Sequence, residues 1–278
     1  MGFYNVGVQK AEVEGKQWKT KERQLKDDIV KACAVHALDV LCLSELGELD
    51  EGIGGNLDEG DVAVWIRSLL DDSAVQPVKI YSDGHYVTIV TNSHVVVDEY
   101  KFVKGFVKEQ EHRSFQHFRV RMEGDDDPVS IIHCHAPAST KRGLTVSERT
   151  QYFTAFHTAC AADRFIWGGD FNTGVIQLTI LLKSIDSRYT GEERGASSAA
   201  QPGTMSSDAS KPAALHLVFS HPIRFKHGDL AVTSGLCSVQ VNSEVGQFYK
   251  GASDAHDLVV AKVIGGSWLQ PWRTCGED

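Results

Sequence analysis

Polar side chains that could bind a cation or move protons lie at the ends of several apolar runs in this sequence. These residues are Glu45, His135, Asp170, Asn172, Asp254 and His256. Strand ends gather on one rim of a layered sheet, so residues that are far apart in the sequence can meet there. Carboxylate oxygens suit a hard cation such as Mg²⁺, while neutral histidines and an asparagine suit proton transfer and oxyanion contact. The pattern predicts metal-assisted acid–base chemistry at one rim of a sheet.

The two histidines of the apolar run 129–135 allow two interpretations. His133 and His135 are two residues apart on a predicted strand, so both point to one face. A His-x-His pair also begins the metal site of some barrel-type hydrolases, but no later set of partners is evident in this sequence. In the other interpretation, one of the two is an ordinary hydrogen-bonded strand histidine.

The segment 168–172 reads Gly-Gly-Asp-Phe-Asn and follows the apolar run 165–167. Its glycines allow a tight turn, and we expect the strand to break there. Asp170 and Asn172 would then face the same pocket. A bare polar turn is the alternative interpretation of this segment, just as a solvated strand end is the alternative for Glu45.

Hydrophobic periodicity indicates an α/β chain with many strands. The expected strands cover residues 3–8, 39–43, 78–107, 115–122, 129–135, 165–167, 229–233 and 258–263, and the expected helices cover 19–36, 62–70, 147–161 and 176–185. We expect residues 191–212, which are rich in Gly, Ser and Ala, to form a flexible surface loop. Because candidate residues lie on both sides of this loop, the sequence predicts a single domain over residues 1–278, with a C-terminal tail at about 265–278.

The composition is that of a globular protein, with 278 residues, 42% hydrophobic and 23% charged. No apolar run approaches the roughly 20 residues that span a bilayer, and no secretory signal is seen, so we expect an intracellular (cytoplasmic or nuclear) protein. Six scattered cysteines predict free thiols in a reducing compartment. The net charge of −9 argues against non-specific nucleic-acid binding through a basic surface, yet a carboxylate-rich metal site is compatible with it. Composition leaves the oligomeric state open.

The order of these motifs along the chain is distinctive. It runs Tyr4-Asn5-Val6, Leu43-Ser44-Glu45, His135 before Pro137, then Trp167-Gly168-Gly169-Asp170-Phe171-Asn172, and finally Ser253-Asp254-Ala255-His256. This series resembles the endonuclease/exonuclease/phosphatase superfamily, the deoxyribonuclease-like phosphoesterases. The resemblance extends over roughly residues 2–264, and its most specific element is the Gly-Asp-Phe-Asn motif. It implies a four-layer α/β sandwich, in which two packed mixed β-sheets are flanked by helices, and a Mg²⁺ or Mn²⁺ cofactor.

The resemblance also implies roles for individual residues. Glu45 would be the principal metal ligand, Asn5 would hold the metal or the phosphate, and His135 would be the first catalytic histidine. Asp170 would polarise the attacking water or bind metal, and Asn172 would orient the phosphate.

Five further positions complete the implied site. Asp229, in a segment similar to the family's Arg-Ile-Asp-Tyr-Ile, would assist a catalytic histidine, and Tyr86 would contact substrate. His256 would be the general base or would anchor the nucleophile, and Asp254 or Asp257 would reach the metal.

The terminal motif departs from the family pattern, because the family has Asp directly before His. Alignment on His256 puts Ala255 at the Asp position, whereas alignment on Ser253-Asp254 puts Ala255 at the His position. The first alignment keeps the base, and a bulge would bring Asp254 or Asp257 to the metal. The second removes the histidine.

The expected activity is metal-dependent hydrolysis of phosphodiester bonds by in-line attack of water, with a nucleic acid or a small phosphoester as partner. A nuclease leads. The alternatives are a phosphatase or phosphodiesterase acting on inositol or lipid head-group phosphates, which the acidic charge favours, and a catalytically degenerate binding member of the family, which the displaced terminal motif favours.

Overall fold

The computed structural model describes most of the N-terminal two thirds of the chain and five strands of the remainder. The described residues are 1–6, 16–44, 46, 59–83, 86–103, 114–126, 128–136, 145–160, 164–171, 175–185, 191–194, 215–219, 229–233, 237–242 and 258–263.

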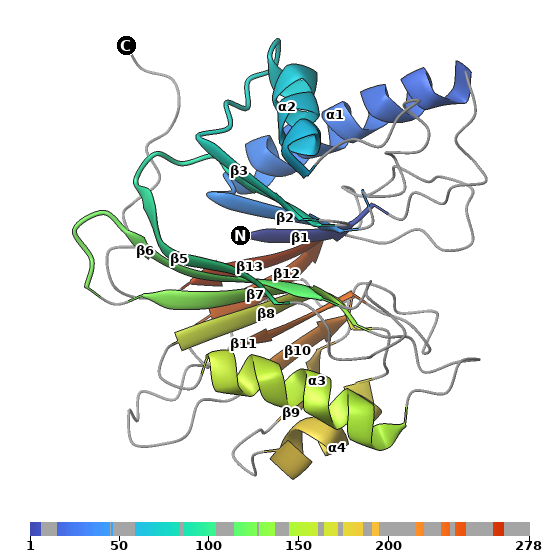
Figure 1. Cartoon of the computed structure of the whole chain (residues 1–278), viewed down its shortest axis with the longest axis vertical. Helices are drawn as coiled ribbons and strands as arrows, with labels where there is room; N and C mark the ends of the chain where they lie inside the picture. Colours follow the sequence, from blue (N-terminus) through green and yellow to red (C-terminus); the bar gives the residue numbers. More distant parts are fainter. Residues whose placement is uncertain are drawn as a thin grey trace.

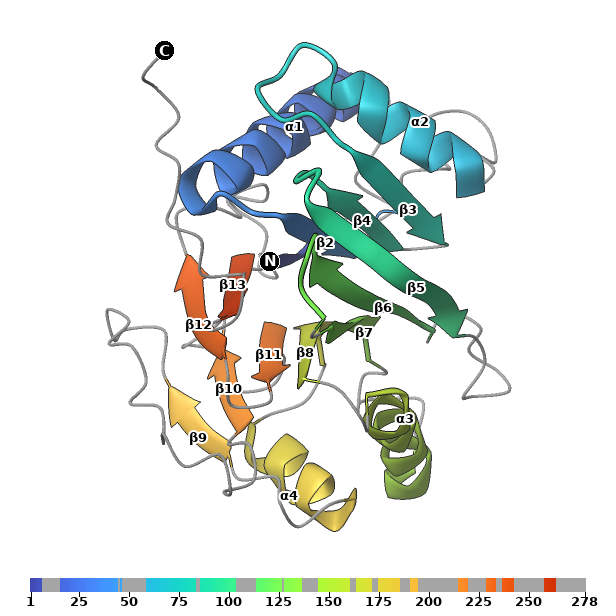
Figure 2. The same cartoon turned by 90° about the vertical axis from the view of Figure 1, so that its left-hand side faces the viewer.

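Two mixed β-sheets pack face to face, and a pair of helices covers the outer face of each (Figures 1 and 2). The first sheet has the order β12-β13-β1-β2-β4-β3, built from β1 (Gly2–Asn5), β2 (Val40–Ser44), β3 (Lys79–Asp83), β4 (Tyr86–Val90), β12 (Cys237–Asn242) and β13 (Leu258–Val263). The second has the order β5-β6-β7-β8-β11-β10-β9, built from β5 (Val95–Val103), β6 (Phe115–Met122), β7 (Val129–His135), β8 (Arg164–Asp170), β9 (Gly191–Arg194), β10 (Leu215–Phe219) and β11 (Asp229–Thr233). The helices are α1 (Lys16–His36) and α2 (Glu59–Leu70) on the first sheet and α3 (Val146–Ala159) and α4 (Val175–Ile185) on the second. The expected four-layer α/β sandwich is confirmed.

Strand alternation sends each strand's apolar residues into two different cores. In β2, Leu41 and Leu43 pack against α1 and α2, whereas Val40 and Cys42 lie between the sheets. Phe3 of β1 is also in the core between the sheets, and is fully buried. If one residue of a strand lies between the sheets, the residues two positions before and after it face the same space.

Helix α3 connects the parallel strands β7 and β8, so it runs back along them and its first turn lies at their carboxyl ends. The helix begins at a capping box in which Thr145 and Glu148 each accept a hydrogen bond from the other's backbone amide. Aromatic residues on its buried side, Tyr152, Phe153 and Phe156, pack on the outer face of the second sheet. This βαβ unit positions the ends of β7 and β8.

Two expectations about local structure were wrong. The strand predicted to break at Gly168 and Gly169 continues through both glycines as β8 and ends at Asp170. Residues 191–194, predicted as the start of a surface loop, form β9, which pairs in parallel with β10. The rest of the predicted loop, 195–212, and the tail, 265–278, lie outside the described residues.

Some compositional expectations can be checked directly. Cys33, Cys42, Cys134 and Cys160 are buried free thiols, as predicted. Burial raises the pKa of Cys33 to about 11 and that of Cys42 to about 12, so both thiols are protonated at neutral pH. Within the described ranges, no helix is long and apolar enough to cross a membrane.

The glycines of β8 are required by close approach rather than by a turn. A Cβ at Gly168 would overlap the ring of Phe3 in the opposite sheet. Gly169 has φ +127°, and a Cβ there would overlap the carbonyl oxygen of Cys134 on β7. These two contacts explain why the motif before Asp170 has glycine at both positions.

We expect Gly169→Ala to lower the free energy of unfolding by about 1–3 kcal/mol or more, because backbone strain and overlap with Cys134 act together. Gly124→Ala is the matched control. Gly124 also has a positive φ, +82°, but no atom lies within 4 Å of its added Cβ. Urea denaturation of both variants measures the difference. Equal losses for the two would contradict the close approach of β7 and β8 at this point.

Candidate active site

The ends of seven strands that carry or adjoin predicted site residues meet at one edge of the sandwich. β1 and β2 run parallel and end at the paired residues Asn5 and Ser44. β7 and β8 run parallel and end at the paired residues His135 and Asp170. The antiparallel neighbours β4, β11 and β13 begin at this edge, as the pairs of Tyr86 with Ser44, Asp229 with Asp170, and Val259 with Phe3 show. The expected rim therefore exists.

A hydrogen bond between the two sheets closes this edge. The Asn5 amide Nδ2 donates to Asp170 Oδ2 over 3.3 Å, and both residues are buried. Strand alternation explains the contact, because Asn5 lies two residues after Phe3 and faces the same inter-sheet core. Two residues that are 165 positions apart in the sequence thus meet in one buried polar pair.

His135 lies on the other side of the same carboxylate. Its Nε2 atom is 3.7 Å from Asp170 Oδ2, too long for a direct hydrogen bond but within ion-pair distance when the ring is protonated. The His135 side chain keeps 15% of its surface exposed, against 4% for that of Asp170. The imidazole is therefore the part of this trio that is most open to solvent or substrate.

Tyr86 holds the backbone of His135 in place. The Tyr86 hydroxyl donates to the Ser114 carbonyl oxygen over 2.7 Å and accepts from the His135 amide over 3.0 Å. Its side chain is buried, with 1% exposed. The role of Tyr86 as a substrate contact stays a prediction, and these contacts give it a supporting role as well.

His133 faces the same inter-sheet space as His135 but lies deeper. It is 1% exposed, its Nδ1 donates to Gln116 Oε1 over 3.0 Å, and its ring packs edge-on against Tyr86. Thr88 donates to the same Gln116 oxygen over 2.7 Å. Burial lowers the pKa of His133 to about 3, so this histidine is neutral at physiological pH. Of the two interpretations of the pair, His133 is the hydrogen-bonded strand histidine and His135 is the one at the rim.

We expect His133 to make the stability pH-dependent. Its folded-state pKa of about 3 lies below the ordinary value of 6.5, so below pH 6.5 the unfolded chain binds a proton that the folded chain does not. The stability that the neutral His133 contributes is fully present above pH 6.5. As the pH drops from 6.5 towards 3, the folding equilibrium constant decreases by up to roughly tenfold per pH unit. Unfolding of His133→Gln, measured from pH 7 to 4, should show a shallower pH slope than the wild type.

His94→Gln is the control for this measurement, because the His94 side chain is exposed and pairs with Glu123 on the surface. A wild-type slope in the His133→Gln protein would contradict the neutral buried state.

The remaining predicted residues are placed only by chain position or register. Asp229, at the start of β11, is paired with Asp170 in the sheet. Five predicted site residues lie outside the described residues: Glu45, Asn172, Asp254, His256 and Asp257. Glu45 directly follows the last residue of β2, Asn172 follows Asp170 by two, and β13 begins two residues after His256. In the sequence, Glu45, Asn172 and His256 are thus within two residues of a described strand.

One polar residue at this edge was not predicted. Ser44 is fully buried, and its hydroxyl has no hydrogen-bond partner within the part of the chain that the structure describes. Two residues after the inter-sheet Cys42, it faces the same space as its strand neighbour Asn5. Alternation along β2 could have identified this position from the sequence.

The chemistry of this edge suits a hard divalent cation. The described residues contain no group of three His, Cys, Asp or Glu side chains that could hold a metal. They do offer the Asp170 carboxylate, the Asn5 amide and the unpartnered Ser44 hydroxyl, at the strand end that leads into Glu45. Mg²⁺ prefers one or two carboxylates together with water and substrate oxygens, and this donor set matches that preference.

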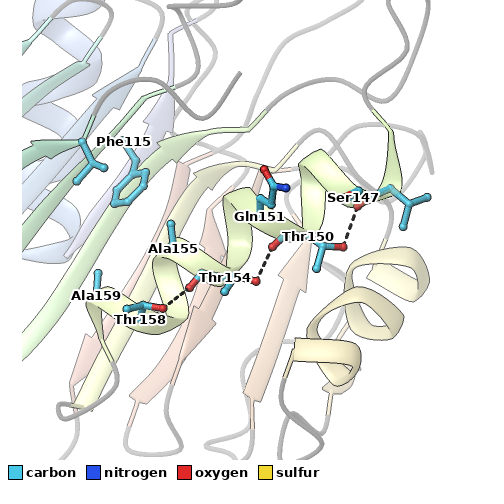
Figure 3. Close-up of a pocket in the computed structure, with 10 residues that line it drawn as sticks. Phe115, Ser147, Thr150, Gln151, Thr154, Ala155, Thr158 and Ala159 are labelled. Carbon is cyan, nitrogen blue, oxygen red and sulfur yellow. Dashed lines mark hydrogen bonds between the residues drawn. The ribbon is translucent and has the colours of Figure 1, made fainter. Parts of the chain in front are cut away.

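A groove of about 890 Å³ lies elsewhere, between α3 and the residues Val103 and Phe115 (Figure 3). The hydroxyls of Thr150, Thr154 and Thr158 turn back to the carbonyl oxygens four residues earlier, which leaves an apolar lining. None of the site residues that the structure describes, Asn5, Tyr86, His135, Asp170 and Asp229, lines this groove.

Comparison with known proteins supports the fold but gives no relative in sequence. No family model and no curated protein matches this sequence. The chain is similar to the structure of the human Nocturnin catalytic domain with a bound sulfate anion, with a TM-score of 0.52, 14% identity, and coverage of 94% of this chain and 92% of that one. It is similar to a humanized D. rerio TDP2 with a TM-score of 0.51, 11% identity and coverage of 94% and 97%. It is also similar to a functionally unknown conserved protein from Enterococcus faecalis, with a TM-score of 0.53, 12% identity and coverage of 96% and 100%.

At these identities the likeness concerns the fold. Nocturnin and TDP2 are members of the superfamily that the sequence motifs resemble, and the alignments extend over nearly the whole of this chain. The described strands place Asn5, His135 and Asp170 together at one edge of the sandwich, in agreement with the order of those motifs. The chain therefore has the fold of the endonuclease/exonuclease/phosphatase superfamily.

Proposed function

We propose that this chain is a divalent-metal-dependent phosphoesterase that hydrolyses phosphodiester bonds, with a nucleic acid as its substrate. The observation that carries the proposal is the trio formed across the two sheets, in which Asp170 Oδ2 lies 3.3 Å from Asn5 Nδ2 and 3.7 Å from His135 Nε2. A carboxylate held between an amide and an imidazole at a strand-end rim can polarise water and move its proton.

The residues have separate proposed roles in the reaction. Asp170, oriented by the Asn5 amide, accepts a hydrogen bond from the attacking water. His135, held by Tyr86 and partly exposed, donates to a phosphoryl oxygen or protonates the leaving oxygen. His256 is assigned as the base or anchor of the nucleophile, and Asn172 as a phosphate contact.

The proposed metal ligands are Glu45, Asn5 and either Asp254 or Asp257. A bound Mg²⁺ or Mn²⁺ would supply Lewis acidity and neutralise charge on the phosphoryl oxygens. Asp229, next to Asp170 in the sheet, is assigned to support a catalytic histidine.

The proposal is tested by nicking of supercoiled plasmid DNA in Mg²⁺, with and without a chelator. We expect cleavage that the chelator blocks and that His135→Ala lowers by roughly 100-fold or more. His94→Ala, a change at an exposed histidine on the surface, is the matched control and should keep wild-type activity. Cleavage that persists in the chelator, or that His135→Ala leaves unchanged, would contradict the proposal.

The acidic charge favours a second substrate class. With a net charge of −9, the protein lacks a general excess of cations for a polyanionic backbone. Phosphate release from inositol phosphates, without DNA or RNA cleavage, would assign the chain to small or lipid head-group phosphoesters. Absence of both activities would assign it to the catalytically degenerate binding members.

A further inference from the structure

A side chain from the first sheet lies between two strands of the second sheet beside His135. Tyr86 is the first residue of β4, and its hydroxyl accepts from the His135 amide over 3.0 Å and donates to the Ser114 carbonyl oxygen over 2.7 Å. Phe115 pairs with Cys134 in the β6–β7 ladder. One further step along both strands would place Ser114 opposite His135. The hydroxyl therefore connects a donor and an acceptor of neighbouring strands at the rim end of this ladder.

The end of β7 is also held on its other side, by β8. The amide of Ala136 donates to the carbonyl oxygen of Asp170 over 2.6 Å. Tyr86 supplies the corresponding anchor on the β6 side. With both anchors in place, Nε2 of His135 lies 3.7 Å from Asp170 Oδ2. A displacement of about 1 Å can lower the rate of an enzymatic reaction roughly 100-fold, so an anchor on the His135 main chain bears directly on the proposed reaction.

The burial and hydrogen bonds of Tyr86 argue against a direct contact with substrate. The residue is 1% exposed, and its ring packs edge-on against that of His133, with the ring centroids 5.0 Å apart. The hydroxyl has one proton, which it donates to the Ser114 carbonyl oxygen. The His135 side chain, in contrast, keeps 15% of its surface exposed. An effect of Tyr86 on the reaction would therefore pass through His135.

We infer that Tyr86 is a positioning residue, whose hydroxyl fixes the main chain of His135 so that the imidazole stays beside Asp170. The inference rests on the proposed function, because it concerns the same site. It adds to that proposal a role for Tyr86 that needs no contact with substrate. The competing explanation is the substrate contact that the family resemblance implies.

Tyr152 of α3 supplies a matched control. Its hydroxyl donates to the same Ser114 carbonyl oxygen, over 3.2 Å, and the residue is also buried, with 0% exposed. Tyr86 reaches this carbonyl from between the sheets, whereas Tyr152 reaches it from the helix side. Each change to phenylalanine keeps the ring and removes one hydrogen bond to Ser114. Of the two changes, Tyr86→Phe also removes the hydrogen bond to the His135 amide.

The experiment compares the wild type, Tyr86→Phe and Tyr152→Phe by kinetics and by NMR. For hydrolysis of bis(p-nitrophenyl) phosphate in Mg²⁺, we expect Tyr86→Phe to lower kcat roughly tenfold or more and to keep the wild-type KM. Solvent exchange of the His135 amide should be slow in the wild type and roughly tenfold or more faster in Tyr86→Phe, with a shift of the His135 ring signals. Tyr152→Phe should keep the wild-type kcat, exchange rate and ring signals. Both variants should melt below the wild type, because each loses a buried hydrogen bond.

The results that would overturn the inference are distinct from one another. A higher KM with unchanged kcat in Tyr86→Phe would make Tyr86 a substrate contact. An equal loss of kcat in Tyr152→Phe would assign the effect to packing around Ser114. Fast exchange of the His135 amide in the wild type would contradict the anchor without any variant. Absence of phosphodiester hydrolysis by the wild type would overturn the proposed function, and the NMR signals would then still support or contradict the anchoring of His135.

Discussion

Asp170→Asn is expected to lower kcat/KM for phosphodiester cleavage by roughly 10³-fold, within the range that general acid–base groups contribute. The asparagine keeps the size of the side chain, and its carbonyl oxygen can still accept the hydrogen bond from Asn5 Nδ2. What is lost is the negative charge and the ability to take a proton beside His135 Nε2. The loss should therefore appear in turnover, with little change in the melting temperature.

A chromogenic phosphodiester such as bis(p-nitrophenyl) phosphate gives the rate for this variant. Asp98→Asn is the matched control, because Asp98 pairs with Arg121 on the exposed face of the β5–β6 ladder. That variant should keep the wild-type rate. If Asp170→Asn retained more than about a tenth of the wild-type rate, the carboxylate would have no direct part in the reaction.

Glu45→Gln is expected to abolish both divalent-dependent activity and stabilisation by divalent ions. A ligand present at 100 times its Kd stabilises the folded state by about 2.7 kcal/mol, which corresponds to a rise of roughly 5 °C or more for a chain of this size. Glutamine has the same length but no charge, and a carboxylate is the ligand that Mg²⁺ requires from the protein. The wild type should show this rise with Mn²⁺, and Glu45→Gln should not.

Glu123→Gln is the appropriate comparison for the second variant, since Glu123 is an exposed glutamate whose partner is His94. It should melt and respond to Mn²⁺ as the wild type does. Full turnover of Glu45→Gln in Mg²⁺ would exclude Glu45 as the principal ligand.

The prediction for Asp170 rests on contacts in the structure, whereas the prediction for Glu45 rests on its position in the sequence. Asp170 is placed by its contacts with Asn5 and His135 in the structure. Glu45 is placed by its position immediately after β2, whose last residue pairs with Asn5. If both variants lose activity as expected, the end of β2 and the trio of Asn5, His135 and Asp170 belong to one functional site.

Much of the architecture was predictable because it depends on local patterns. Apolar runs of period two located most strands of the first half of the chain, and the polar residues at their ends indicated where a site would form. The order of the motifs predicted the two-sheet sandwich, which the strand order confirms. The expectation of a single domain over residues 1–278 stays a prediction.

Other features were not accessible from local patterns. Glycines at 168 and 169 indicated a turn, but the structure continues the strand because Phe3 and Cys134 approach its backbone closely. The sequence 191–194 has no apolar alternation to distinguish it from a loop, and it becomes β9 only by pairing with β10. Both outcomes depend on partners that are distant in the sequence.

The amino-acid order alone determined which side chains end which strands, because alternation and chain direction are properties of each segment. The tertiary structure decided which of them meet: it turned Asn5 towards Asp170, left His135 at the rim, and enclosed His133 and Ser44 between the sheets. Burial and pairing of this kind arise when two sheets face each other in one register. That register is set by the sum of all their contacts, and no single motif contains it.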